Sequence, residues 1–310
     1  MHLRRRLWPA IVALTVMVPA RAAAPEVVAT ILPVHSLVAA VTDGVTTPVL
    51  LLEGNASPHS HALKPSQARA LQSADLVVWV GVALETFLHR NLHDAASASH
   101  VLTLLELPTV QVLAAREGGR FEAHHHARSA GKDGEPAHRV DPHIWLDPDN
   151  ALAVVDAVTA ALVRLDAGNA QAYQDNAARA RSRITELDVE LRRDLAPISA
   201  APYLVFHDAY QAFERHYGLR ASGAVTLDPQ RTPGAARVRA LRHQIQEQGI
   251  GCVFREPQFE PRLVATLIAG TGARVGVLDP MGSELTPGPD AWFHLMRNLA
   301  SALATCLSQP

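Results

Sequence analysis

The sequence has few aromatic residues, only two cysteines and, after its first residues, no long apolar run. Phe, Trp and Tyr make up 5% of the 310 residues, so Ala, Val and Leu have to build most of the core. Such a core suits parallel strands that are covered by helices. Two isolated cysteines without a CxxC spacing argue against a cysteine-based metal site. The apolar runs after residue 22 are too short to cross a bilayer as helices.

The first 22 residues have the pattern of a cleavable export signal. Three arginines at 4–6 precede an apolar stretch over 7–18, and Ala20-Arg21-Ala22 fits a small-x-small cleavage site. The stretch is short for a permanent anchor, which is the alternative. We therefore predict an exported mature protein. Without residues 1–22, 24 basic residues stand against 30 acidic ones, a net charge of about −6, which argues against nucleic acid or an anionic membrane surface as partner.

The two cysteines lie in the C-terminal half, at Cys252 and Cys306. An even number of cysteines in an exported chain suggests one disulfide bond, with two buried free thiols as the alternative. The bond would close a loop of roughly 55 residues and stabilise the fold by about 4 kcal/mol in the chain-entropy description.

Strand and helix patterns alternate along both halves of the chain, which predicts an α/β fold with parallel sheets. The apolar runs of the first half are at 27–31, 49–52, 76–81 and 101–105, and those of the second half are at 203–206, 251–254 and 275–278. Between the halves, Ile184, Leu187, Leu191 and Leu195 recur at spacings of three and four, so one long amphipathic helix is expected. It would be roughly 40 Å long. The helix before it is expected to be capped by Asp149 or Asn150.

These patterns divide the chain into four predicted parts. They are a signal peptide (1–22), an N-terminal lobe (23–168), a linking helix (169–196) and a C-terminal lobe (197–310). Residues 117–140 are polar and rich in glycine, charge and histidine, which predicts a His-rich mobile loop in the N-terminal lobe. We expect two lobes, each a mainly parallel sheet flanked by helices, joined by one long rigid helix.

Three histidines and one aspartate lie beside short apolar runs and together form a metal-binding set. His59 follows the 49–52 run by a short loop, and His207 and Asp279 directly follow the runs at 203–206 and 275–278. His143 lies in a Pro-bounded turn before the long helices. Ligands of open α/β sheets bind beyond the carboxyl ends of the strands. Zinc accepts three imidazoles and a carboxylate, although each residue alone is equally typical of an ordinary polar or capping position.

The local sequence resembles that of the metal-binding solute-binding proteins of ABC importers, and most closely the zinc-specific group typified by ZnuA. The segments that carry the resemblance are, in order, PHSHALKPSQ, ADLVVWVG, DPHIWLDP, VFHDAYQAFERHYGL, REPQF and LDPMG. They cover nearly all of the mature chain. The resemblance implies two α/β lobes joined by one backbone helix, with the metal in the cleft between them. It implies a monomer without enzymatic activity that captures Zn²⁺ and delivers it to an ABC permease in the inner membrane.

The first metal ligand of that family corresponds to His59, because Leu63 and Pro65 fix the register of the motif. His61 is then a neighbour that could compete for the metal. Some zinc-binding members carry Glu beside the first histidine, whereas this chain has Pro58. The family's paired cysteines also resemble those of this chain.

The other ligands correspond to His143, His207 and Asp279, and either Asp279 or a water molecule has to fill the fourth position. The resemblance and the chemistry both favour zinc, because manganese-binding members place a carboxylate where His207 stands, and a nitrogen-rich shell suits zinc better. A divalent-metal protein of the same family with another specificity is the alternative. Asp208 adjoins His207, and its carboxylate has capping of the following helix as its other role.

The His-rich segment also resembles the corresponding loop of zinc-uptake proteins. Its histidines would hold a second, weaker zinc or accept metal from a periplasmic chaperone, and a dispensable solvated loop is the alternative. They are His124, His125, His126 and His138.

A secreted zinc hydrolase is the competing class of function. A catalytic zinc keeps an open position for water, and Glu256 would be its candidate base if Asp279 did not bind the metal. The sequence has no HExxH motif. We therefore expect a binding protein, with a structural hydrogen-bonding role for Glu256.

Overall fold

The computed structural model describes residues 23–54, 56–95, 100–116, 121, 140–226, 233–259 and 262–308. The predicted signal peptide lies outside the described residues, and so do the four histidines at 124–126 and 138. Within the described part of the chain, none of the helices combines the length and the apolar character that a membrane span requires.

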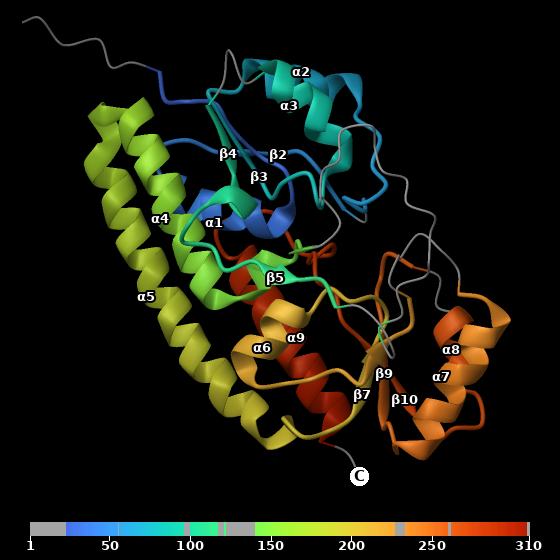
Figure 1. Cartoon of the computed structure of the whole chain (residues 1–310). Helices are drawn as coiled ribbons and strands as arrows, with labels where there is room; N and C mark the ends of the chain where they lie inside the picture. The colour runs from blue at the N-terminus through green and yellow to red at the C-terminus, as the bar shows by residue number, and fades with distance from the viewer. Residues whose placement is uncertain are drawn as a thin grey trace, which may run out of the picture.

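Four parallel strands form the first sheet, in the order β2–β1–β3–β4. Their bounds are β1 Val27–Ala29, β2 Val49–Leu50, β3 Leu76–Trp79 and β4 His100–Thr103. Alternate residues of β1 and β3 face opposite sides, so one side packs on helix α1 (Leu32–Thr42). The other side is covered by α2 (Pro65–Ser73) and α3 (His89–Ala95) (Figure 1).

A second parallel sheet, in the order β10–β9–β7–β8, lies in the C-terminal half. Its strands are β7 Tyr203–Val205, β8 Gly223–Ala224, β9 Cys252–Arg255 and β10 Arg274–Val277. One face packs on α7 (Ala235–Glu247) and α8 (Arg262–Ile268). The other face packs on α6 (Gln211–Tyr217) and α9 (Ala291–Leu307). The predicted disulfide between Cys252 and Cys306 is confirmed and ties α9 to β9.

Two long helices run side by side, α4 (Pro148–Leu165) next to the first sheet and α5 (Ala170–Leu195) along both lobes (Figure 1). The predicted apolar stripe of α5 is buried, and α5 contacts α1 at one end and α6 and α9 at the other. The predicted fold class, two mainly parallel sheets joined by a long helix, is therefore confirmed. Single-turn 3-10 helices connect several elements: η1 Thr86–Leu88, η2 Leu104–Glu106, η3 Ile144–Leu146, η4 Ala167–Asn169 and η5 Ala196–Ile198.

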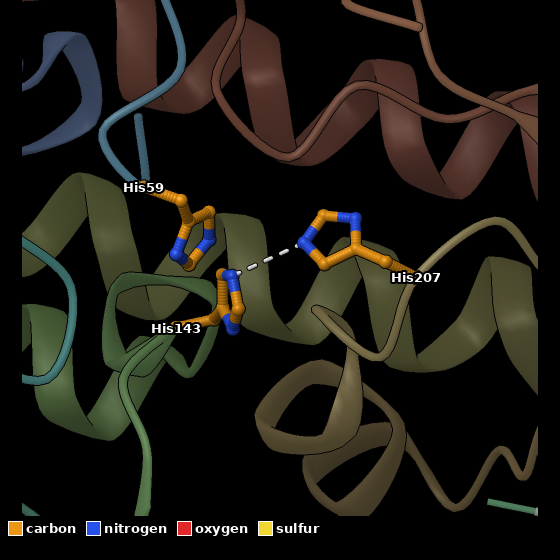
Figure 2. A group of neighbouring side chains, drawn as sticks. All are labelled: His59, His143 and His207. Carbon is orange, nitrogen blue, oxygen red and sulfur yellow. Dashed lines mark hydrogen bonds between the residues drawn. The ribbon is translucent and has the colours of Figure 1, made fainter. Parts of the chain in front are cut away.

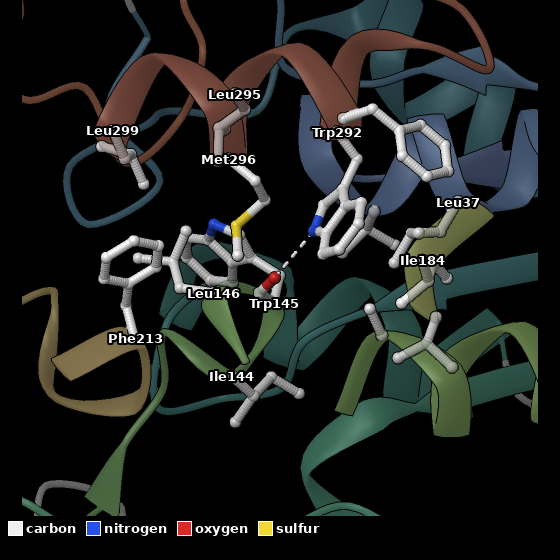
Figure 3. Close-up of a cluster of buried hydrophobic side chains, with 14 of the residues drawn as sticks. Leu37, Ile144, Trp145, Leu146, Ile184, Phe213, Trp292, Leu295, Met296 and Leu299 are labelled. Atoms are coloured by element: carbon white, nitrogen blue, oxygen red, sulfur yellow. Dashed lines mark hydrogen bonds between the residues drawn. The ribbon is translucent and has the colours of Figure 1, made fainter. Parts of the chain in front are cut away.

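Helix α9 joins the two lobes through a shared core, part of which Figure 3 shows. The backbone N–H of Trp292 donates to Ser36 Oγ on α1 at 2.8 Å, and its indole Nε1–H donates to the carbonyl of Trp145 at 2.8 Å. The indole of Trp145 in turn donates to the carbonyl of Pro280 at 2.8 Å. Trp145 follows the predicted ligand His143 by two residues. These hydrogen bonds therefore connect the two lobes close to His143.

Two local predictions were wrong. Val140 is not part of a loop, because it pairs with Ala114 in an antiparallel hairpin of β5 (Leu113–Ala114) and β6 (Val140–Asp141). The cap of α4 is Asp147, whose Oδ1 accepts from the N–H of Asp149 at 2.9 Å. Asn150 instead donates to the carbonyls of Gln111 and Ile144.

Candidate metal centre

The structure brings His59, His143 and His207 together in one group (Figure 2). His59 lies in the turn that follows β2, and His143 lies between β6 and η3. His207 follows β7, where the N–H of Ala209 donates to the His207 carbonyl and delays the start of α6 to Gln211. Two of the three histidines therefore come from the predicted N-terminal lobe and one from the C-terminal lobe.

The spacing of the ring nitrogens suits a single tetrahedral ion. One ligand atom from each histidine lies within 4.8 Å of the other two. The Nε2 atoms of His143 and His207 are 3.4 Å apart. With Zn–N distances of about 2.05 Å and tetrahedral angles, neighbouring ligand nitrogens lie about 3.3 Å apart. The two buried imidazoles are therefore already at the separation that a shared zinc ion requires.

A buried carboxylate orients each of these two imidazoles. His143 Nδ1 donates to Asp141 Oδ1 at 2.7 Å, and His207 Nδ1 donates to Glu256 Oε1 at 2.7 Å. An ionised carboxylate only accepts, so the proton is held on Nδ1 and the Nε2 lone pair is left for a metal. The structural hydrogen-bonding role expected for Glu256 is thus what the geometry displays.

The environment shifts the pKa values of His59 and His207 in opposite directions. Burial, reinforced by repulsion from His143 and His207, lowers the pKa of His59 to about 3. His59 is therefore neutral, as a metal ligand must be. Burial opposes protonation of His207 as well, but the charge and hydrogen bond of Glu256 outweigh it and raise the pKa of His207. Protons thus compete with metal mainly at His207 rather than at His59.

The three histidines line a small cavity between the lobes. Its other walls are Ser57 and Pro58 from the N-terminal lobe, and Glu256, Gln258, Phe259, Pro280 and Met281 from the C-terminal lobe. The cavity volume of about 20 Å³ is room for one ion or water molecule.

Asp279 is not among the atoms that the structure gathers at the centre. Its Oδ1 accepts from Gln258 Nε2 at 2.8 Å and from the N–H of Met281 at 3.0 Å. Its Oδ2 accepts from both the N–H and the hydroxyl of Ser283 at 2.7 Å. The carboxylate thus holds the turn that carries Pro280 and Met281 into the cavity wall, which leaves its role as a ligand a prediction.

Two neighbours of the ligands have other partners. His61 Nε2 bonds Gln67 Oε1 at 2.8 Å and its ring lies against Phe87, so His61 is not in the group. Asp208 does not cap α6, because its carboxylate pairs with Arg116 instead. Asp141 and Arg116 were not predicted from the sequence. The signal for Asp141 was its place two residues before His143, but Arg116 carries no local signal.

A second group of potential ligands, Asp147, Asp149 and His216, is an ion-paired cluster. His216 Nδ1 is 3.1 Å from Asp147 Oδ1, and its Nε2 is 2.7 Å from Asp188 Oδ1. Burial opposes its charge, but hydrogen bonds to Asp147 and Asp188 prevail and raise the pKa of His216. The carboxylates already pair with His216, and the guanidinium groups of Arg192 and Arg215 lie beside them, so the cluster disfavours a metal cation.

The chain matches the family described as "ZnuA: Zinc-uptake complex component A periplasmic" over residues 27–306. It is 39% identical over 306 residues to the "High-affinity zinc uptake system protein ZnuA" of Brucella suis biovar 1, which covers 91% of this chain and 92% of that protein. The protein of the same name from Paracoccus denitrificans is 41% identical over 309 residues, covering 94% and 95%. A solved structure, "Crystal structure of ZnuA", has a TM-score of 0.76 at 23% identity and covers 91% of this chain and 99% of that one.

Proposed function

This chain belongs to the ZnuA family of periplasmic components of zinc-uptake complexes, and we propose that it captures Zn²⁺ with His59, His143 and His207 and delivers it to an ABC importer. The observation that carries the ligand set is the 3.4 Å separation of the Nε2 atoms of His143 and His207, each oriented by its own carboxylate. A nitrogen-rich shell of this kind favours zinc over manganese.

The fourth ligand is Asp279 or a water molecule. The four hydrogen bonds that Asp279 already accepts favour water, because a metal-bound Asp279 would have to give up part of its contact with Ser283. In either case zinc is cargo, and the imidazoles have to be neutral to bind it, so protons compete with the metal.

Capture requires the lobes to admit the ion without losing their relative positions. We propose a small tilt rather than a wide hinge, since α5 packs on both lobes and the hydrogen bonds of Trp145 and Trp292 cross between them. The half-exposed turn of His59 is the side on which the ion enters, because His143 and His207 are 5% and 6% exposed.

The partner is an ABC permease of the inner membrane, which the loaded protein meets as a monomer in the periplasm after loss of residues 1–22. The His-rich segment is proposed to hold a second, weaker zinc or to receive metal from a periplasmic chaperone. Both proposals concern residues outside the described part of the chain and rest on the sequence. Deletion of residues 121–139 should remove a weak zinc equivalent and leave the tight one, and unchanged stoichiometry would refute this.

Titration of the mature protein with zinc and manganese, beside His207→Ala and the control His243→Ala, tests the proposal. His243 is an exposed histidine of α7 that pairs with Glu247. We expect tight zinc binding that is lost in His207→Ala and kept in His243→Ala, with weak manganese binding throughout. Preference for manganese would support the other specificity within the family. Tight zinc binding by His207→Ala would refute the ligand set.

A further inference from the structure

The β5–β6 hairpin reaches the surroundings of two proposed ligands that come from different lobes. On β6, Asp141 holds the ring of His143. Just beyond β5, the Arg116 guanidinium contacts Asp208, the residue after His207. Figure 1 shows β5 in the middle of the molecule, near α6. The β5–β6 pair therefore contacts the turns that carry His143 and His207, on both sides of the cavity.

Arg116 makes a partly buried, fork-like contact in this place. Its Nε lies 3.0 and 2.9 Å from the two oxygens of Asp208, and a terminal nitrogen also bonds Asp208 Oδ1. The other terminal nitrogen donates to Glu214 Oε2 on α6 at 2.8 Å. The side chain of Arg116 is 19% exposed and those of Asp208 and Glu214 are 11% and 4% exposed. Charge-assisted bonds of this planar, two-pronged kind are strong and directional.

Further contacts hold the Arg116 guanidinium and the segment that precedes it. Its Cζ lies 4.1 Å from the centroid of the Phe121 ring. Gln211 of α6 donates to the carbonyl of Ala114 at 3.1 Å, beside the same strand. On the N-terminal side, Asn150 of α4 exchanges hydrogen bonds with the backbone of Gln111. The segment is thus fixed to α4 at Gln111 and to the C-terminal lobe at Ala114 and Arg116.

We propose that Arg116 is a positioning residue for His207, an inference that rests on the proposed zinc-binding function. It holds the His207–Asp208 turn of the C-terminal lobe against the hairpin of the N-terminal lobe. In this way it keeps His207 Nε2 at its 3.4 Å separation from His143 Nε2. Loss of the fork lets the turn move away from the hairpin and speeds the release of bound zinc.

The test compares zinc release into excess chelator by wild type, Arg116→Gln, Arg116→Lys and the control Arg181→Gln. Arg181 forms an exposed ion pair with Asp156 on α4. We expect release from Arg116→Gln to be about tenfold faster, the lower end of the effect of removing a partner of a metal ligand. Arg116→Lys should also release zinc faster, because an ammonium cannot make the two-pronged contact. Arg181→Gln should match wild type.

A Co²⁺ spectrum separates positioning from general loss of stability, because its ligand-field bands report the geometry at the ion. We expect altered bands in Arg116→Gln and unaltered bands in Arg181→Gln. The double variant Arg116→Gln/Asp208→Asn removes the uncompensated charge at Asp208, so it should melt at a higher temperature than Arg116→Gln while still releasing zinc fast.

Three outcomes overturn the inference: release at the wild-type rate from Arg116→Gln, the same from Arg116→Lys, or wild-type release restored in the double variant. The second and third would show that charge compensation alone is at work. Absence of tight zinc binding by the wild type would refute the proposed function itself. Wild-type release from Arg116→Gln, with zinc binding lost in His207→Ala, would refute the role of Arg116 alone.

Discussion

Replacing Glu256 with Gln removes the charge that orients His207 while keeping the size of the side chain. Glu256 is 1% exposed, and its Oε1 lies 2.7 Å from His207 Nδ1. The carboxylate only accepts there, which leaves the Nε2 lone pair free for zinc. A glutamine can also donate through its amide nitrogen, and this permits the opposite tautomer, in which Nε2 carries the proton and cannot bind a metal.

The expected cost follows from what such partners contribute elsewhere. Removal of a carboxylate that orients a metal-bound histidine lowers affinity by about 10–100-fold, or about 1.4–2.7 kcal/mol. Both side chains are buried, at 1% and 6% exposure, so we expect Glu256→Gln to fall within this range at pH 7.5.

The same change weakens proton competition. The pKa of His207 is the balance between burial, which lowers it, and the charge and hydrogen bond of Glu256, which raise it. Without the carboxylate the pKa of His207 falls, so fewer protons compete with zinc as the pH drops. The zinc affinity of the wild type should therefore decline more steeply between pH 7.5 and 5.5 than that of Glu256→Gln. The ratio of the two affinities should become smaller as the pH falls.

Competition titration against a chelator of known affinity at pH 7.5, 6.5 and 5.5 measures both effects. Glu247→Gln is the matched control, since Glu247 forms an exposed pair with His243 in the same lobe. It should match wild type at every pH. Affinity of Glu256→Gln equal to that of wild type, or parallel pH profiles of the two, would refute the proposed orientation of His207 by Glu256.

Three further changes have expected outcomes. Burial raises the pKa of Glu85 to about 7, so the folded state binds a proton that the unfolded chain has lost, and stability falls as the pH rises from about 4.5 to 7. Glu85→Gln should therefore stabilise the protein at pH 8, by on the order of 3 kcal/mol. The gain in unfolding free energy, measured in urea, should vanish toward pH 4.5, and a gain independent of pH would contradict this. The disulfide between Cys252 and Cys306 spans 54 residues, so reduction should lower the unfolding free energy by about 4 kcal/mol, and an unmoved urea midpoint would contradict it. Asp279→Asn should lower zinc affinity less than about tenfold if water is the fourth ligand, because its main contacts are to the turn at Ser283; a loss as large as that of His207→Ala would make Asp279 the ligand.

The elements that the sequence predicted well are those with strong local patterns. All four residues of the apolar run in β3 are buried, and so is the apolar stripe of α5, as their sequence patterns predicted. The three histidines were predicted from their places after strands or, for His143, in a Pro-bounded turn, and the resemblance to a known family decided the set. The hairpin β5–β6 was not found, because two-residue strands are too short to show a period.

Contacts between distant residues were outside the reach of local patterns. Asp279 follows a strand as His207 does, but the nearby Ser283 and Gln258 determine where its carboxylate points. Arg116 lies 92 residues from Asp208 along the chain, and only the packing of the hairpin against α6 brings them together. Residue type and place in the sequence could predict which residues lie near the cavity. Which of those side chains face the cavity depends on their hydrogen-bond partners in the fold.

The hydrogen bond between Trp292 and Ser36 joins residues that are 256 positions apart. Helix α1, which covers one face of the first sheet, gains its partner α9 only at the far end of the sequence. A chain that emerges N-terminus first therefore leaves uncovered the parts of α1 and α5 that α9 packs on until the last helix is made. Folding that depends on such distant contacts is slow, so the core shared by the two lobes can form only after the last helix is available.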